Sequence, residues 1–222
     1  RNFLTEKYIF QFESTAYSDT HTVDGVEAIL KGSFMDNTLI VNNNDESVKY
    51  SQAYMDAASE SGVSPYHLCS RTIQEVGVKG SNATNGKHSQ YPGIYNFYSI
   101  HAYQGSNPIA NGLAYASGAT ASDSEIAKYG MPWNTQYKAI VGGASFLGND
   151  YVGAGQDTLY LQKWDVVGTM GTHQYMQNLQ APYSQASKTY DGYKDANLID
   201  SNLVFVIPVY KNMPQKTELA NR

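Results

Sequence analysis

The chain has 222 residues, of which 41% are hydrophobic and 16% are charged, and its net charge is −5. This length is enough for one sizeable core, and the negative charge without a basic cluster argues against nucleic acid as a partner. No run of about 18 apolar residues could span a membrane, and a single cysteine, Cys69, excludes a disulfide scaffold within the chain. The chain begins at Arg1 without a signal peptide, so we expect a fragment or a processed product.

The tyrosine content is the most informative part of the composition. There are 19 tyrosines among few charges, and tyrosine offers a flat apolar face with a hydroxyl, which suits sugar rings as well as protein cores. The composition therefore favours an extracellular or wall-associated protein.

Residues 1–45 are expected to form a lead-in segment packed on the main domain. An extended stretch over 1–20 precedes a short helix over 23–31, and the Asn-Asn-Asn-Asp run at 42–45 predicts a turn. Apolar residues at helical spacing predict the next helix over 46–61, ended by Gly62.

Residues 65–76 form the helix around which the candidate chemistry is arranged. Ser64 is a plausible N-cap and Pro65 suits the first helical position, while Gly77 and Gly80 offer left-handed stop positions. Glu75 lies near the C-terminal end, where the helix dipole disfavours a carboxylate. A half-buried acid that keeps its proton is what general-acid catalysis needs.

The helical wheel places Glu75 on the border of an apolar stripe. Arg71 is expected on the opposite, polar side. Because Arg71 precedes Glu75 by four residues, an ordinary surface salt bridge is an equal alternative from this helix alone.

The remaining chain predicts a loop-rich lobe followed by more helices. Residues 81–130 are rich in Ser, Asn, Gly and Tyr, which predicts a functional lobe with a short hairpin. Helices are expected over 137–147, 157–163 and 172–190, and the apolar run 203–210 is strand-like. The paired glycines Gly142 and Gly143 are expected to let another helix approach closely, plausibly the one that carries Glu75.

This order predicts a two-lobed α+β fold, a mainly helical lobe plus a small loop and hairpin lobe with a cleft between them. The main domain is expected over 46–190, with the loop-rich lobe at about 81–130 and a C-terminal strand-like extension over 191–222.

Several blocks of sequence resemble the peptidoglycan-cleaving N-acetylglucosaminidases of glycoside hydrolase family 73, in their autolysin branch. The resemblance covers roughly residues 23–190. The matching blocks are 25–32, 70–77 around Glu75, 95–103 with Ser99 where glycine is usual, 133–146, 155–160 and 171–175.

The resemblance implies a lysozyme-like fold and hydrolysis of the β-1,4 bond after N-acetylglucosamine, with Glu75 as general acid. It implies peptidoglycan glycan strands as the partner, an extracellular location in the bacterial cell wall and a monomeric catalytic module of a larger wall-bound protein. No cofactor is expected, and the five histidines show no zinc-like spacing.

The second catalytic group stays open between two alternatives. Asp123 or Glu125 could supply a second carboxylate, although Gln104 stands where several autolysin relatives have Asp. Alternatively, the 2-acetamido oxygen of the substrate attacks the anomeric carbon. Tyr175, which matches a cleft tyrosine of the family, would then orient the acetamido group.

Eight further residues are candidates for substrate binding, each weighed against a packing or capping role. They are Tyr95, Asn96, Tyr98, Tyr103, Gln156, Tyr160, His173 and Gln174.

Three other functions are weighed against this one. A non-catalytic glycan-binding domain and a muramidase on the same fold remain alternatives. A cysteine peptidase is disfavoured because Cys69 lies on the apolar stripe.

Overall fold

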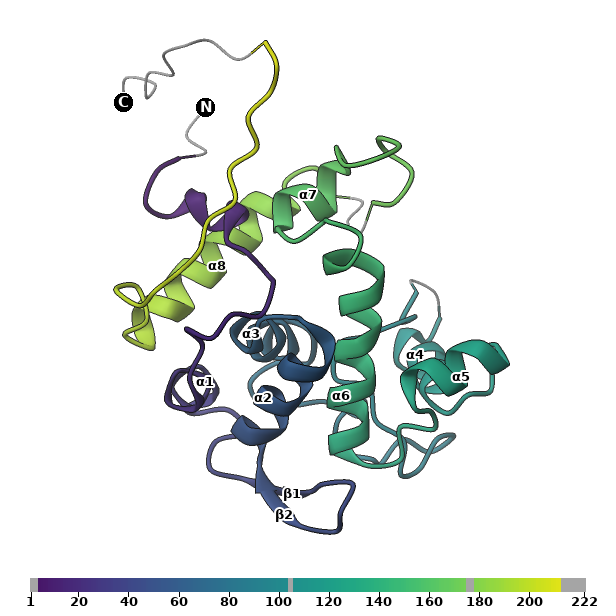
Figure 1. Ribbon diagram of the computed structural model, residues 1–222. Coiled ribbons are helices and arrows are strands. Elements are labelled where there is room, and N and C mark those ends of the chain that lie inside the picture. Colours follow the sequence, from purple (N-terminus) through teal and green to yellow (C-terminus); the bar gives the residue numbers. More distant parts are fainter. Residues whose placement is uncertain (1–3, 104–105, 175–177, 213–222) are drawn as a thin grey trace. The chain divides into compact units, whose positions relative to one another are not determined.

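The computed structural model describes residues 4–103, 106–174 and 178–212 (Figure 1). The chain divides into two compact units, one made of residues 17–150 and the other of residues 1–16 together with 151–222. The domain boundaries expected from the sequence, after residues 45 and 190, stay predictions. No helix in the described residues is long and apolar enough to cross a membrane.

The unit over 17–150 is mainly helical. Its elements are α1 (Val23–Leu30), β1 (Leu39–Val41), β2 (Ser47–Lys49), α2 (Tyr50–Ser61), α3 (Pro65–Val76), α4 (Pro108–Ala116), α5 (Asp123–Tyr129) and α6 (Gln136–Leu147). The π-helical segment η2 (Gly148–Val152) contains the boundary between the two units, after residue 150.

Helices α1, α2 and α3 pack on one another, and α6 packs along α2 and also contacts α5 (Figure 1). Their shared core contains large side chains that are almost fully buried, among them Trp133, Tyr54, Tyr98, Tyr115 and Leu68.

The predicted helices over 23–31, 65–76 and 137–147 are confirmed within a residue or so. Helix α2 starts at Tyr50 rather than at residue 46, because Ser47–Lys49 pair antiparallel with Leu39–Val41 across the turn expected at 42–45. This hairpin is the sheet that the structure describes.

Two helices, α4 and α5, stand in the lobe that the sequence predicted to be loops with a hairpin. Both begin at capping residues. The Asn107 side chain accepts from the Ala110 N–H with Pro108 at the first helical position, and Ser122 and Glu125 form a capping box. These local signals were present in the sequence, but the short apolar faces showed no clear helical period.

The paired glycines of α6 make room for two aromatic side chains. The expectation that they let a neighbouring helix approach was therefore wrong. A Cβ on Gly142 would collide with the Trp133 indole, and one on Gly143 would collide with the ring of Tyr98. Glycine is required here because two large rings press directly on the helix backbone.

The other unit joins the two ends of the chain. It contains η1 (Tyr8–Phe12), α7 (Leu159–Trp164) and α8 (Ala181–Asp195). Helix α8 was expected to start near residue 172, and it starts nine residues later.

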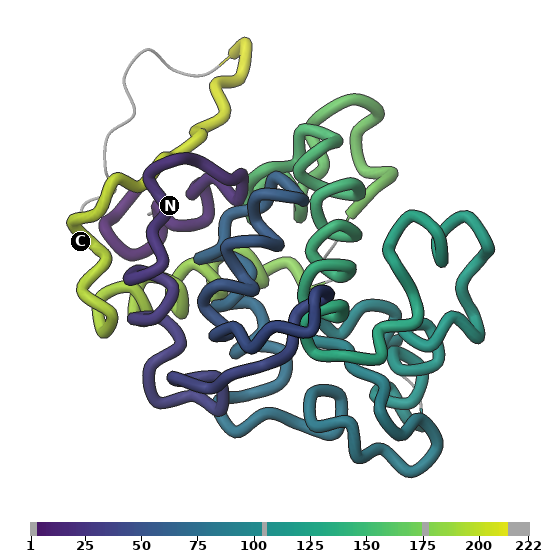
Figure 2. Tube along the Cα trace, turned by 60° about the horizontal axis from the view of Figure 1, so that its bottom comes forward, coloured from purple at the N-terminus to yellow at the C-terminus, as the bar shows by residue number. Residues whose placement is uncertain are grey.

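The strand-like run over 203–210 lies beside the N-terminal segment (Figure 2). Val206 N–H donates to the Phe12 carbonyl at 2.7 Å, and Ser14 N–H donates to the Val204 carbonyl at 2.7 Å. Glu13 and Phe205 form an isolated antiparallel bridge between them. The run is therefore extended as predicted, but it contributes one bridge rather than a strand of a sheet.

Candidate active site

Helix α3 places Glu75 through signals that the sequence contains. Ser64 Oγ accepts from the His67 N–H at 3.3 Å, and Pro65 occupies the first turn. At the other end Gly77 has φ of +78°, and its N–H donates to the Ile73 carbonyl. The cap residue is itself fixed by His21, whose Nε2 lies 3.1 Å from Ser64 Oγ. Glu75 is thus held one residue before the end of a firmly capped helix.

Glu75 lines a cleft of about 270 Å³ in the unit over 17–150. Its side chain is 32% exposed and the residue as a whole is exposed, so the carboxyl is open to a ligand. The other lining residues come from the end of α3, the following loop, the segment over 96–102 and the start of α4. They are Val76, Ser81, Ala83, Asn96, Ser99, Ala102, Pro108, Ile109 and Gly112.

Arg71 lies beside Glu75, with Nη2 3.9 Å from Oε1. The prediction that Arg71 faces solvent was wrong, because its side chain is only 9% exposed. Helix α3 is enclosed on more sides than an amphipathic surface helix, since Leu68 and Thr72 are also fully buried. The i,i+4 ion pair offered as the alternative to catalysis is therefore present, but with a buried arginine, and of the two residues Glu75 is the one that lines the cleft.

Asn96 stands in the cleft wall, but its amide is engaged by the backbone. Nδ2 donates to the carbonyls of Ile100 and Gly112 at 2.8 and 3.0 Å, and Oδ1 accepts from the Ile100 N–H at 3.1 Å. Both amide protons are used. The described contacts give Asn96 the role of fixing the loop, and substrate binding by its remaining lone pair stays a prediction.

The three candidate tyrosines of this segment have different environments. Tyr98 is 1% exposed and donates to the Ile140 carbonyl at 3.1 Å, so it belongs to the core. Tyr95 is half-buried with its phenol over Gly86. Tyr103 is 63% exposed, and its hydroxyl pairs with Nδ1 of His101. Of the three, Tyr103 offers the most open ring to a sugar.

The comparisons with known proteins agree with one another. The sequence is 33% identical over 164 residues to a beta-N-acetylglucosaminidase of Bacillus subtilis, covering 72% of this chain and 16% of that protein. It is 34% identical over 170 residues to a bifunctional autolysin of Staphylococcus aureus, covering 72% of this chain and 12% of that protein. The fold matches the crystal structure of S. aureus glucosaminidase B with a TM-score of 0.65 and 25% identity, over 87% of this chain and 68% of that one.

The chain belongs to the N-acetylglucosaminidase family of bacterial autolysins. The expected family and the lysozyme-like α+β fold are thereby confirmed. No protein-family profile matches the chain. The chain spans less than a fifth of the length of these two curated relatives.

Gln156 and His173, both expected to line the family's cleft, form a hydrogen-bond cluster in the unit that holds the chain ends. Gln156 Oε1 lies 2.7 Å from His173 Nδ1, and its Nε2 donates to the His173 carbonyl at 2.9 Å. Asp165, which sequence reasoning missed, accepts from the His173 N–H at 2.6 Å and from Gln156 Nε2 at 3.2 Å. The ring of Tyr151 stacks on His173. This cluster closes the loop over 165–173 at its base.

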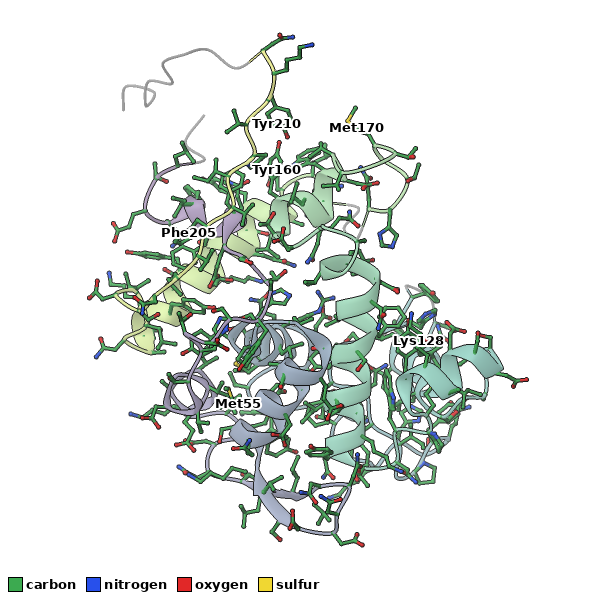
Figure 3. All side chains as sticks on the ribbon, viewed as in Figure 1. Met55, Lys128, Tyr160, Met170, Phe205 and Tyr210 are labelled. Atoms are coloured by element: carbon green, nitrogen blue, oxygen red, sulfur yellow. The ribbon has the colours of Figure 1, made fainter. Side chains whose placement is uncertain are left out.

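Tyr160 and Gln174 are the other two candidates in this unit. The hydroxyl of Tyr160 points toward that of Tyr210, at 2.8 Å (Figure 3). Gln174 is exposed. Tyr175, the residue expected to orient the acetamido group, lies outside the described residues. Substrate binding by these residues stays a prediction.

Neither candidate for the second carboxylate is among the residues that line the Glu75 cleft. Glu125 is the capping-box residue: Oε2 accepts from Ser122 N and Oγ at 2.8 and 2.6 Å, and Oε1 accepts from the Tyr115 hydroxyl at 3.1 Å. The hydrogen bonds from Ser122 lower the pKa of Glu125. Asp123 is exposed in the first turn of α5.

Two other chemistries were weighed from the sequence. Cys69 is buried, and burial raises the pKa of its thiol, so it lacks the environment of a nucleophile. The described part of the chain contains no group of three or more His, Cys, Asp or Glu side chains that could hold a metal ion.

Sequence reasoning missed Ser99 and Ile109 as residues of the cleft. Only the Asn107-Pro108 helix start signalled that a helix would begin beside Glu75. The signal at Ser99 was its place in a sequence block where the resembling family usually has glycine, which suits the positive φ of this residue.

Proposed function

We propose that this chain hydrolyses peptidoglycan at the β-1,4 bond after N-acetylglucosamine, with Glu75 as the general acid. The observation that carries the proposal is the position of Glu75, the one carboxyl among the described lining residues of a cleft. Family membership supports the substrate class, since its relatives are named N-acetylglucosaminidase and autolysin. By the same argument, we propose that the chain acts in the bacterial cell wall as a module of a larger protein.

In the acid step, Glu75 gives its proton to the glycosidic oxygen while the bond from that oxygen to the anomeric carbon breaks. This leaves a carboxylate on Glu75. The Arg71 guanidinium at 3.9 Å then stabilises the new negative charge without having to move. The ion pair between Arg71 and Glu75, which the sequence offered as an alternative to catalysis, would thus assist the acid step.

For the second group, the positions of the carboxylates favour assistance by the substrate. The 2-acetamido oxygen would attack the anomeric carbon, and water would open the resulting ring with Glu75 as base, which gives retention of configuration. Glu125 binds Ser122 in the capping box of α5, Asp123 is exposed in the first turn of that helix, and neither is among the lining residues. Clean inversion in the NMR spectrum of the first-formed product would exclude this route.

The deciding experiment digests purified peptidoglycan with the wild type and with Glu75→Gln, reduces the products and identifies the new ends by mass spectrometry. Wild-type products that end in reduced N-acetylglucosamine, absent with the variant, support both the bond and the acid. Products that end in reduced N-acetylmuramic acid would indicate a muramidase. Wall binding without products from the wild type would indicate a glycan-binding domain.

A further inference from the structure

Ser99 lines the Glu75 cleft in a backbone conformation that a serine rarely adopts. Its φ is +52°, and His101 two residues later has φ of +56°. Side chains with a Cβ are disfavoured in this left-handed region, where glycine fits without strain. Two such residues within three positions make this part of the cleft wall strained.

Hydrogen bonds from neighbouring residues hold the backbone at Ser99 in this conformation. The Asn96 amide binds both backbone groups of Ile100, accepting from its N–H at 3.1 Å and donating to its carbonyl at 2.8 Å. The turn is closed by the Ala102 N–H, which donates to the Ser99 carbonyl at 3.1 Å. Strained residues that are held in this way gather at functional sites.

The Ser99 hydroxyl is available to a ligand as both donor and acceptor, whereas the other uncharged polar side chains of the cleft already bind the backbone. Ser81 Oγ accepts from the Ala83 N–H at 3.1 Å, and the Asn96 amide protons are both used. Within the described residues, no hydrogen bond engages the hydroxyl of Ser99, which is half-buried. Among the uncharged polar side chains that line the cleft, Ser99 is therefore the one with no hydrogen bond to the described protein, and its hydroxyl can both donate and accept.

We propose that Ser99 is a substrate-recognition residue whose hydroxyl hydrogen-bonds a neutral hydroxyl or amide group of the glycan strand bound beside Glu75. This inference rests on the proposed function. A neutral partner fits because a hydroxyl carries no charge and a glycan strand presents sugar hydroxyls and acetamido groups at close spacing. The strained backbone is retained because glycine, which would relieve it, cannot supply the hydroxyl.

Two substitutions separate the hydroxyl from the strain. Ser99→Ala removes the hydroxyl and keeps the Cβ, whereas Ser99→Gly removes both. Each should raise the KM for soluble glycan strands freed of peptide stems about 3- to 10-fold, the range of one neutral hydrogen bond, with a smaller change in kcat. The melting temperature should rise with Ser99→Gly and stay near the wild-type value with Ser99→Ala.

Asn37→Gly is the matched control, because Asn37 also has positive φ, at +49°, but does not line the cleft. It should leave KM unchanged. Wild-type KM in Ser99→Ala overturns the proposal, and so does a rise confined to Ser99→Gly, which would reflect a looser loop.

A binding experiment distinguishes a failure of this proposal from a failure of the proposed function. Calorimetry with the same peptide-free glycan strands measures Kd for the wild type and both Ser99 variants. If the wild type binds the strands but does not cleave them, the hydrolase assignment fails, while a 3- to 10-fold weaker Kd in both variants still supports Ser99. Equal Kd values in all three proteins, or no binding by the wild type, would overturn the role of Ser99.

Discussion

Arg71 and Glu75 stand one helical turn apart on α3, with the buried guanidinium 3.9 Å from the accessible carboxyl. An exposed pair at this spacing is worth a few tenths of a kcal/mol. Here Glu75 lines the cleft and the arginine is buried beside it, so the cation lies next to the charge that develops when the acid loses its proton.

This relationship predicts the effect of Arg71→Met, which keeps the length of the side chain and removes its charge. We expect kcat for peptidoglycan to fall about 100-fold, the lower end of the range for losing one preorganised electrostatic contact, while KM changes little. The measurement is steady-state kinetics of wall solubilisation, with circular dichroism to confirm the fold.

The partner experiment places Arg71→Met in the Glu75→Gln background. Because the glutamine develops no charge, the second substitution should cost almost nothing further. A full additional loss there would mean that Arg71 acts on the substrate or on the fold rather than through Glu75.

Asn96→Ala tests the loop clamp. The substitution leaves the Ile100 N–H and the carbonyls of Ile100 and Gly112 without their partner. Since unsatisfied buried groups are costly, we expect a loss of about 2–4 kcal/mol in the free energy of unfolding, read from urea denaturation. Asn149→Ala is the control, because this exposed amide donates to one carbonyl, that of Ser145. Equal losses in the two variants would contradict the clamp.

The sequence could predict those parts of the site that depend on local signals. Ser64, Pro65 and Gly77 sufficed to bound α3 and place Glu75 near its end. Burial of Arg71 depends on neighbours that are distant in the chain, so a helical wheel could not foresee it. Asn96 shows the same limit, since a polar residue among aromatics needs a partner and the sequence could not tell a backbone partner from a ligand.

The environment of His67 predicts how the free energy of unfolding depends on pH. Burial lowers the pKa of His67 to about 3, and the positive charge of Arg71 adds to the effect. The unfolded chain takes up this proton near pH 6.5, so between pH 6.5 and 3 the unfolded state binds more protons than the folded state. The contribution of neutral His67 to the free energy of unfolding is therefore fully present above pH 6.5 and is lost as the pH falls toward 3.

His67→Gln should make the melting temperature less dependent on pH within this window. The measurement is a series of thermal melts of both proteins from pH 8 to pH 4. The difference between them should be constant above pH 7 and should shift in favour of the variant as the pH falls. Parallel curves down to pH 4 would show that His67 is protonated in the folded protein.

Glu13 predicts the opposite dependence, in the unit that holds the chain ends. Loss of hydration raises the pKa of Glu13 to about 8, and a hydrogen bond with Tyr193 opposes the rise. The unfolded chain releases this proton near pH 4.5, so between pH 4.5 and 8 the folded state binds more protons. The stability contributed by the protonated carboxyl is thus lost as the pH rises through this window.

Glu13→Gln replaces the carboxyl with a neutral group of nearly the same shape at the bridge to Phe205. We expect little change in melting temperature at pH 4.5 and a gain of about 5–10 °C over the wild type at pH 8. Thermal melts at half-unit intervals from pH 4.5 to 8.5 test this. Asp157→Asn is the control within the same unit, because burial raises the pKa of Asp157 as well, but Asp157 is not part of the bridge to Phe205. A gain from Glu13→Gln that is the same at every pH would mean that the carboxyl is already ionised in the folded protein, and that the variant acts through packing alone.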